Sequence, residues 1–435
     1  MLTEASPRGP AALPESLSPE KLVFFWVTEF DYGAREHHGG YLRYFSLSRE
    51  LLRMGHEVYF IAVLKPAEFE LGSAWFSSLK SQGHLTGFTA ITYEPRRARV
   101  TWATRLLHPY AGNLLLASDR ANALRHVSQF AQQHPPDVMI ASSRNLFFIP
   151  DAFRDKALTI IDFCDAESLY FWRDARHAAA TRQYRKAVRH FFRMLQAAVH
   201  ERYYCRRSDL NILVSPADKR AIDRIGGLPQ QTLFMPNGLT LVASGQPLAA
   251  KHRNRIIFTG NMDFPPNSEA AIYFLDFVFP LVQRDNPGVE FVIAGANPTA
   301  ELLARQNNNV RLTGYVKDLN HEIATSALYV APLVTGSGFK NKIAEAIVNR
   351  TFIVATPIAV EFLDARIRSL IEVAAAPAEM AQSITKYLRN PELTLERVDQ
   401  LYDLVVNDQN SWAQRARDLL ATMKAAKKSR AARRV

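Results

Sequence analysis

The stretch that decides the fold is Ala331–Thr356, APLVTGSGFKNKIAEAIVNRTFIVAT. It starts at the end of an apolar run, passes through a loop with Gly336 and Gly338, and then predicts a short helix and a strand. Both glycines let the backbone approach a ligand, because neither carries a Cβ. We expect Asn341 to cap the helix, which would point free N–H groups and a positive dipole end at the loop. An anion could bind there.

Three charged residues accompany this loop. Lys340 and Lys342 add full positive charge at the expected start of the helix. Glu345 lies early in the helix, off the apolar stripe of Ile343 and Ile347, so it could face the same cleft. An ordinary loop–helix–strand unit with two solvated lysines is the alternative that the local sequence leaves open.

Apolar runs and helical patterns alternate on both sides of this stretch. Residues 22–28 (LVFFWVT) read as a strand buried on both faces, and a helix at 41–54 and a strand at 58–64 follow. A second cycle of the same kind begins at Arg255. Such β–α–β units favour parallel sheets, so we predict an α/β protein with two Rossmann-like parallel-sheet lobes facing a central cleft.

The turn Pro236-Asn237-Gly238 and the loss of apolar periodicity after it mark the boundary between the lobes. We predict a disordered leader (1–20), an N-terminal Rossmann-like lobe (21–240), a C-terminal Rossmann-like lobe (241–410) and a basic tail (426–435). A last amphipathic helix should pack back on the first lobe. This last helix spans residues 411–425.

Composition limits the class of protein. The 435 residues are 48% hydrophobic and carry a formal net charge of +11. No run of about 18 apolar residues occurs, so we predict no transmembrane helix. Cys164 and Cys205 form neither a disulfide framework nor a metal-like spacing, which favours a reducing cytoplasm.

The excess positive charge suggests an anionic partner. Residues 182–207 interleave Arg and Lys with Phe and Tyr at helical spacing. This pattern fits a helix at an anionic membrane surface, and equally a partly buried helix with a solvated basic side. In the first case, the protein would bind peripherally to the inner face of the membrane. Nucleic acid is not expected as a partner, since only composition supports it.

Five segments, in order, resemble the group 1 (family 4-like) glycosyltransferases of the GT-B fold. Each is a weak motif alone, but their order and spacing make a strong signal. The segments are HHGGYLRYFSLSRELLRMGHEV (37–58), LFMPNGL (233–239), FTGNMDFPPN (258–267), VRLTGYVKDL (310–319) and GSGFKNKIAEAIVNRTFIVAT (336–356).

The resemblance implies an enzyme that moves a sugar from a nucleotide diphosphate sugar to a lipid-linked or glycan acceptor. It implies that the lobe 21–240 binds the acceptor and the lobe 241–410 binds the nucleotide-sugar donor. It implies a retaining mechanism with no metal and no cofactor. Glu345 matches the later glutamate of the family's paired motif, which binds the ribose; Ser337 stands where the earlier glutamate would be. The implied catalytic residues are Lys340, Lys342 and Glu345. The implied donor-binding residues are Gly39, Gly40, Gly260, Asn261, Tyr315, Val316, Asp318, Ser337, Gly338 and Glu345.

For the acceptor, we expect contacts from Asp165 and Glu167, in the loop after the strand 158–163, and from His38. Helix capping is the alternative for Asp165. Many relatives carry a histidine where this chain has Ser142 and Ser143. Two other functions stay open: a catalytically degenerate protein that binds or scaffolds, and a sugar-nucleotide epimerase of the same fold.

Overall fold

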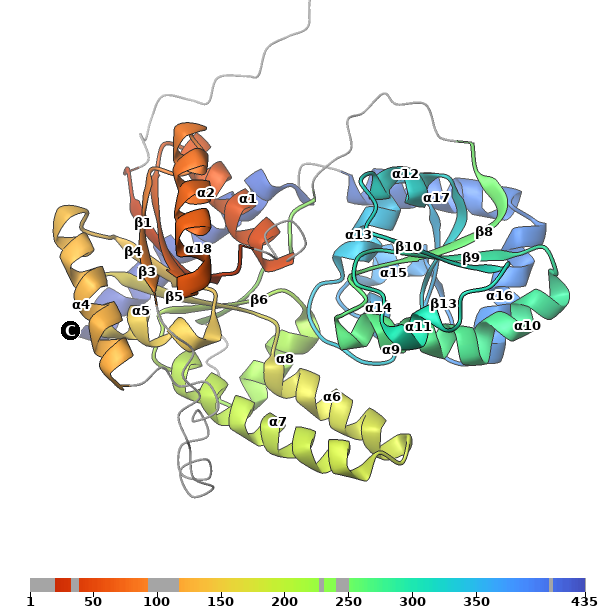
Figure 1. The fold of residues 1–435 in the computed structure, drawn as a ribbon. Helices are drawn as coiled ribbons and strands as arrows, with labels where there is room; N and C mark the ends of the chain where they lie inside the picture. Colours follow the sequence, from red (N-terminus) through yellow and green to blue (C-terminus); the bar gives the residue numbers. More distant parts are fainter. Residues whose placement is uncertain are drawn as a thin grey trace, which may run out of the picture.

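The computed structural model describes residues 20–32, 39–92, 117–226, 231–239, 250–406 and 410–434. These form two parallel sheets, each covered by helices on both faces (Figure 1). The first has seven strands in the order β3-β2-β1-β4-β5-β6-β7, and the second has six in the order β10-β9-β8-β11-β12-β13. The predicted α/β architecture of two Rossmann-like domains is confirmed.

The first domain contains most of the N-terminal half. Its strands are β1 (Val23–Phe30), β2 (Glu57–Leu64), β3 (Gly87–Thr92), β4 (Val138–Ala141), β5 (Leu158–Cys164), β6 (Leu210–Leu213) and β7 (Thr232–Phe234). Its helices are α1 (Gly39–Arg53), α2 (Phe69–Ser81), α4 (Ala117–Gln133), α5 (Phe148–Phe153), α6 (Glu167–Ala180), α7 (Tyr184–Cys205) and α8 (Pro216–Arg224).

The second domain follows the same βα alternation. Its strands are β8 (His252–Thr259), β9 (Glu290–Ala294), β10 (Val310–Gly314), β11 (Ser326–Ala331), β12 (Phe352–Ala355) and β13 (Glu372–Val373). Its helices are α9 (Pro265–Tyr273), which continues through a π-helical turn into α10 (Phe279–Asp285), then α11 (Ala300–Leu303), α12 (Leu319–Ala324), α13 (Asn341–Val348), α14 (Pro357–Val360), α15 (Ala365–Ser369), α16 (Pro377–Arg389) and α17 (Glu392–Val405).

Side chains of β1 show why the first sheet needs two covering layers. Phe24 and Trp26 belong to one buried cluster, whereas Phe25 and Val27 belong to another. Successive residues of a strand point to opposite faces, so a continuous apolar run supplies both clusters.

The final helix, α18 (Trp412–Arg434), packs on the first domain. Trp412, Leu419 and Met423 are buried in the same cluster as Phe24 and Trp26. The chain therefore passes between the domains twice, and the two crossing segments meet where Leu239 pairs with Ser411.

Each sheet has one point where the order of its strands reverses. In the first sheet this is between β1 and β4, and in the second between β8 and β11. Loops from neighbouring strands diverge there, which leaves room for a ligand beside the carboxyl ends of the strands.

Several elements differ from the sequence prediction. The helices α2 and α5 were not predicted, and the segment after β5 contains α6, which begins at Glu167. Residues 117–133 form α4, and residues 93–116 before it lie outside the described residues. No helix among the described residues is both long and apolar enough to cross a membrane.

Truncation of α18 side chains should destabilise the first domain. Leu419 is 0% exposed, so Leu419→Ala should lower the free energy of unfolding by about 2–5 kcal/mol through lost burial and the remaining cavity. Chemical denaturation followed by circular dichroism measures this loss. Leu395→Ala is the matched control, because Leu395 is 63% exposed and should change stability by less than about 0.5 kcal/mol. Equal losses in both variants would contradict the assigned packing.

Candidate functional site

The helix α13 starts directly after the glycine-containing loop, at the carboxyl end of β11. It begins at Asn341, one residue earlier than predicted, and Lys340 is its N-cap residue without a side-chain cap bond. Asn341 Oδ1 instead accepts a hydrogen bond from Asn237 Nδ2 at 3.0 Å. The predicted capping role of Asn341 is therefore wrong, because a tertiary contact occupies its side chain.

Lys342 lies at the junction of β8 and β11. Its ammonium donates a hydrogen bond to Asn267 Oδ1 and lies 4.5 Å from the centre of the Phe258 ring. Burial lowers the pKa of Lys342 to about 7, and Glu345 partly opposes that effect. A Cβ on Gly260 would lie 3.0 Å from Lys342 Nζ, so glycine after β8 leaves the space that the ammonium needs.

Glu345 is half-buried one turn further along α13. Burial raises the pKa of its carboxyl group, and the nearby Lys342 ammonium counteracts the rise. Among the described residues, no hydrogen-bond donor is recorded for this carboxylate. Beneath it, the hydroxyls of Thr259 and Tyr329 lie 2.7 Å apart. A half-exposed carboxylate beside a buried ammonium can accept hydrogen bonds from a polar ligand.

Lys340 turns back into the loop that precedes it. Its ammonium donates to the carbonyl oxygens of Ser337 at 2.6 Å and Gly338 at 2.9 Å. Burial lowers the pKa of Lys340, although Glu361, Asp218 and Asp165 favour its charged form. Lys340 thus fixes the shape of the loop, whereas Lys342 lies at the site itself.

Two carboxylates of the first domain contact this loop. The Ser337 hydroxyl donates to Asp165 Oδ2 at 2.8 Å, and the Gly338 N–H donates to Asp218 Oδ2 at 3.1 Å. Gly338 has φ +75°, and a Cβ there would lie 3.0 Å from the Asp165 Cβ. Only glycine fits this backbone conformation without strain. The loop therefore already binds anionic groups through a hydroxyl and a backbone N–H.

Ion pairs from α6 and α7 hold the second domain nearby. Arg173 forms a bidentate pair with Glu361 at 2.5 and 2.6 Å and also donates to the Gly336 carbonyl at 2.8 Å. Lys186 pairs with Glu269 at 2.8 Å. These contacts place the hairpin formed by α6 and α7 against the loop before α13.

The remaining predicted donor residues lie around the carboxyl ends of the strands. Asn261 Oδ1 accepts from Asp263 N and from Asn297 Nδ2, both at 3.2 Å. Tyr315 is exposed and Val316 packs against the core after β10. Asp318 accepts from His321 N at 3.0 Å and so caps α12. Gly39 and Gly40 form the first turn of α1, beyond the end of β1.

Of the three predicted acceptor residues, Asp165 and Glu167 belong to the described part of the chain. Asp165 lies beside the loop before α13, where it accepts a hydrogen bond from the Ser337 hydroxyl. Glu167 lies in the first turn of α6 instead of a loop, and its carboxylate pairs with Arg144. His38 lies outside the described residues. Ser142 accepts from Trp26 Nε1 at 2.9 Å.

Other residues of the site were not singled out from the sequence. Arg43 is buried and donates to Asp162 Oδ2 at 2.8 Å and to Asn237 Oδ1 at 3.0 Å, which ties α1 to the segment that leads into the second domain. Asp218 accepts from Ala166 N at 3.0 Å as well as from the loop. The S-x-x-D spacing of Ser215 and Asp218 marks a helix start, but no local pattern reports the contacts with the loop.

No cluster of three or more His, Cys, Asp or Glu side chains suited to a metal ion occurs in the described part of the chain.

Residues 253–390 match the family model described as glycosyl transferases group 1. A curated relative, an uncharacterised 44.6 kDa protein in the cps region of Klebsiella pneumoniae, is 27% identical over 148 residues, which cover 32% of this chain and 38% of the relative. The chain thus matches little more than a third of that relative's length.

Solved structures resemble the whole described fold. Anabaena Alr3699/HepE in complex with UDP and glucose has a TM-score of 0.62 at 13% identity, covering 93% of this chain and 100% of that one. A mutant of S. aureus TarM in complex with Fondaparinux, alpha-GlcNAc-glycerol and UDP has 0.63 at 11%, covering 92% and 99%. WaaG, a glycosyltransferase involved in lipopolysaccharide biosynthesis, has 0.55 at 12%, covering 92% and 99%. The GT-B arrangement of two domains is shared with these proteins.

Asp218 should make stability depend on pH. Burial raises the pKa of Asp218 to about 6, and the charge of Asp165 adds to this, while hydrogen bonds from Ser215 and Ala166 and the charge of Lys340 oppose it. The folded chain therefore binds more protons than the unfolded chain between about pH 4 and pH 6, so the Asp218 contribution to stability falls as pH rises through that window.

Asp218→Asn cannot ionise and should lose less stability than wild type between pH 4 and pH 7, with a difference in thermal midpoint of at least about 2 °C. Differential scanning calorimetry at both pH values measures this difference. Asp223→Asn, in the same helix and ion-paired with Lys219 instead of the loop, is the control. If the stability of Asp218→Asn changes with pH as much as that of wild type, Asp218 is not the group responsible for the change.

Proposed function

We propose that this chain is a group 1 glycosyltransferase of the GT-B fold, which the family match over residues 253–390 and the shared fold support. In this proposal it moves a sugar from a nucleotide diphosphate sugar to a lipid-linked or glycan acceptor. One observation carries the proposal: Lys342 and Glu345 lie together at the strand-order reversal of the second sheet, directly after the Gly336–Gly338 loop. Nucleotides bind at such reversals in α/β sheets.

Each part of the donor has a matching group. Glu345 would accept hydrogen bonds from the ribose hydroxyls, and Lys342 would face the diphosphate together with the first N–H groups of α13. Gly39 and Gly40 would bring the N-terminus of α1 to the same phosphates. The base would lie along Tyr315, Val316 and Asp318 and contact their backbone, since the Asp318 side chain already caps α12. Related structures contain UDP, which supports a nucleotide-sugar donor.

The proposed reaction needs charge stabilisation more than a strong base. The bond between the anomeric carbon and the diphosphate oxygen breaks, and the acceptor hydroxyl oxygen forms the new bond on the same face of the sugar. The departing phosphate oxygen takes the hydroxyl proton. Lys342 and fixed N–H groups would stabilise the negative charge that develops on the diphosphate. In this proposal, protein cations do this work without a metal or cofactor.

Ser337 replaces the glutamate that the family pattern has at this position. Its hydroxyl and the Gly338 N–H contact Asp165 and Asp218 in this structure. We propose that the same two donors contact hydroxyl groups of the transferred sugar, and that Asp165, which lies beside them, faces the incoming acceptor.

Two other functions have specific motivations. A degenerate protein that binds a nucleotide sugar without transfer is motivated by Ser337 and Ser142, which stand where relatives carry Glu and His. An epimerase would convert the sugar without releasing nucleoside diphosphate, and the described residues contain no set of acid and base side chains grouped around the site for it. Product analysis separates all three functions, because only the transferase couples release of the diphosphate to a new glycosidic bond.

Substitution of the two central residues tests the site. A thermal-shift panel of UDP-, GDP-, ADP- and dTDP-sugars first identifies the donor, since a ligand of the folded state raises its apparent stability. Lys342→Met should lower kcat about 100-fold or more, through lost stabilisation of the leaving diphosphate. Glu345→Gln should lower kcat/KM by roughly tenfold, through weakened hydrogen bonds to the ribose.

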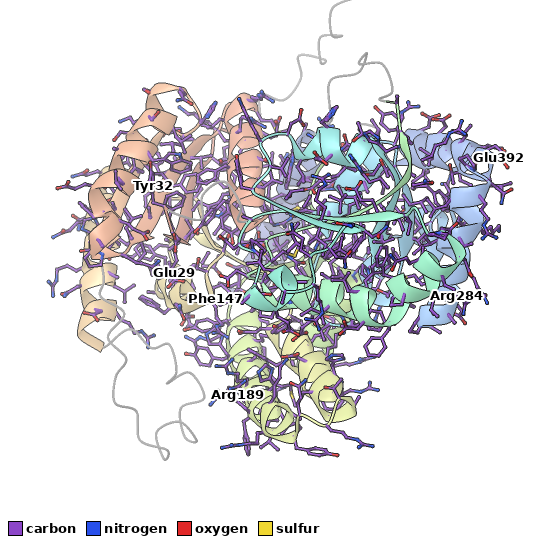
Figure 2. All side chains as sticks on the ribbon, turned by 45° about the vertical axis from the view of Figure 1, so that its right-hand side comes forward. Glu29, Tyr32, Phe147, Arg189, Arg284 and Glu392 are labelled. Atoms are coloured by element: carbon purple, nitrogen blue, oxygen red, sulfur yellow. The ribbon has the colours of Figure 1, made fainter. Side chains whose placement is uncertain are left out.

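The controls are Lys386→Met on α16 and Glu392→Gln at the start of α17. Figure 2 labels Glu392 at the outer edge of the second domain. Both should retain wild-type turnover of the donor. If Lys342→Met and Glu345→Gln also retain it, the assigned site is wrong.

Lys342 should couple donor binding to protonation. Its pKa of about 7 means that the ammonium is largely neutral above that pH, whereas a bound diphosphate favours the charged form. Donor affinity should therefore fall by up to about tenfold per pH unit above pH 7 and level off below pH 6. Calorimetric titration in buffers of different ionisation enthalpy measures the proton uptake. Lys342→Arg stays charged throughout and should bind with a flat profile from pH 6 to pH 9. If donor affinity falls with pH as steeply in Lys342→Arg as in wild type, a group other than Lys342 causes the pH dependence.

A further inference from the structure

The helix α7 exposes an apolar stripe to solvent. Tyr184 is 65% exposed and Phe192 is 55% exposed, and five more large apolar side chains of this helix are exposed with them. At 3.6 residues per turn, all seven lie within an arc of roughly 120° along the whole helix. The stripe consists of Tyr184, Val188, Phe191, Phe192, Leu195, Val199 and Tyr203.

The opposite face of α7 faces the protein. His190, Ala197, Glu201 and Cys205 are its buried residues, and α7 packs along α6. The side of α7 that packs against the first domain is therefore the side opposite to the stripe. Tyr203 contacts Tyr204 and Arg207, but the other six residues of the stripe belong to none of the buried clusters of the described residues. Contiguous exposed apolar patches of this kind mark interaction surfaces.

Positive charge runs beside the stripe. Arg185, Arg189 and Arg193 each directly follow a stripe residue, so they form a parallel row along one edge. Arg202 and Arg206 are exposed near the end of the helix. The single acidic residue of α7, Glu201, is buried. The exposed side of α7 thus offers apolar and cationic groups without any anionic ones.

The position of the helix leaves this face accessible. The hairpin of α6 and α7 projects below the two domains in Figure 1, and Figure 2 shows Arg189 on it from a second direction. The same hairpin contacts the donor loop through Arg173 and pairs with the second domain through Lys186. A surface held against the stripe would lie close to the proposed site.

We propose that this stripe docks on an anionic lipid bilayer, with its apolar side chains at the level of the headgroups and its arginines on the lipid phosphates. Interfacial helices combine aromatic and large apolar residues on one side with Arg and Lys beside them. Anionic lipids complement the arginine row, and their attraction weakens with salt. The docking does not depend on the identity of the donor, so it can be tested without turnover.

The test is co-sedimentation of the full chain with vesicles of phosphatidylglycerol and phosphatidylethanolamine, with phosphatidylcholine vesicles as the neutral comparison. Wild type should bind the anionic vesicles and lose most of that binding between about 50 mM and about 500 mM NaCl. Phe192→Ser with Leu195→Ser should lower the partition coefficient about tenfold or more. Arg185→Gln with Arg189→Gln should lower it and remove the preference for anionic lipid.

The matched apolar control is Phe277→Ser with Leu303→Ser, both exposed in the second domain, and the matched charge control is Arg284→Gln with Arg366→Gln. Both should bind like wild type. A third variant, Arg430→Gln with Arg433→Gln and Arg434→Gln, separates the C-terminal tail from α7. The proposal is overturned if wild type ignores anionic vesicles, if only the tail variant loses binding, or if the stripe variants merely dissolve a dimer that light scattering detects in wild type.

Discussion

Parallel strands bring every loop that follows them to one edge of the sheet, and this constraint organises the molecule. In each domain the order of the strands reverses once, between β1 and β4 and between β8 and β11. At the second reversal, a glycine after β8 leaves room for Lys342 from the helix that follows β11. The chemistry of the site thus depends on the absence of a side chain at Gly260 as much as on the presence of the lysine.

Contacts between the domains give the loop before α13 its shape before any ligand binds. Asp165 and Asp218 accept from the loop, Arg173 donates to it, and Lys340 donates to its carbonyl groups from within. Carboxylates of the first domain occupy hydrogen-bond donors that a ligand could use. Binding would therefore exchange protein partners for ligand partners, at a lower net gain than an empty site would give.

Periodicity in the sequence was sufficient to predict most strands, because the buried apolar runs of parallel sheets are distinctive. It was insufficient for α2 and α5. The local sequence also predicts Asn341 as a helix cap wrongly, because its side-chain partner Asn237 lies more than a hundred residues away. The family motifs singled out Lys342 and Glu345, which lie near each other at the start of α13. Arg173 and Asp218 could not be found in this way, since each acts across the domain interface and carries no local signature. The exposure of the α7 stripe likewise follows from which face α6 covers, a question that helical spacing alone leaves open.

The return of the last helix to the first domain has a consequence for the order of folding. Trp412 and Leu419 complete a core whose other members include Phe24, Trp26 and Leu51. On the ribosome, those early residues emerge long before α18 is synthesised, so the first domain must wait for the end of the chain to bury its apolar surface fully. The second domain, whose cluster lies between Ile256 and Val405, can close first. Nascent chains of this protein should therefore expose part of this apolar cluster to chaperones until α18 has emerged.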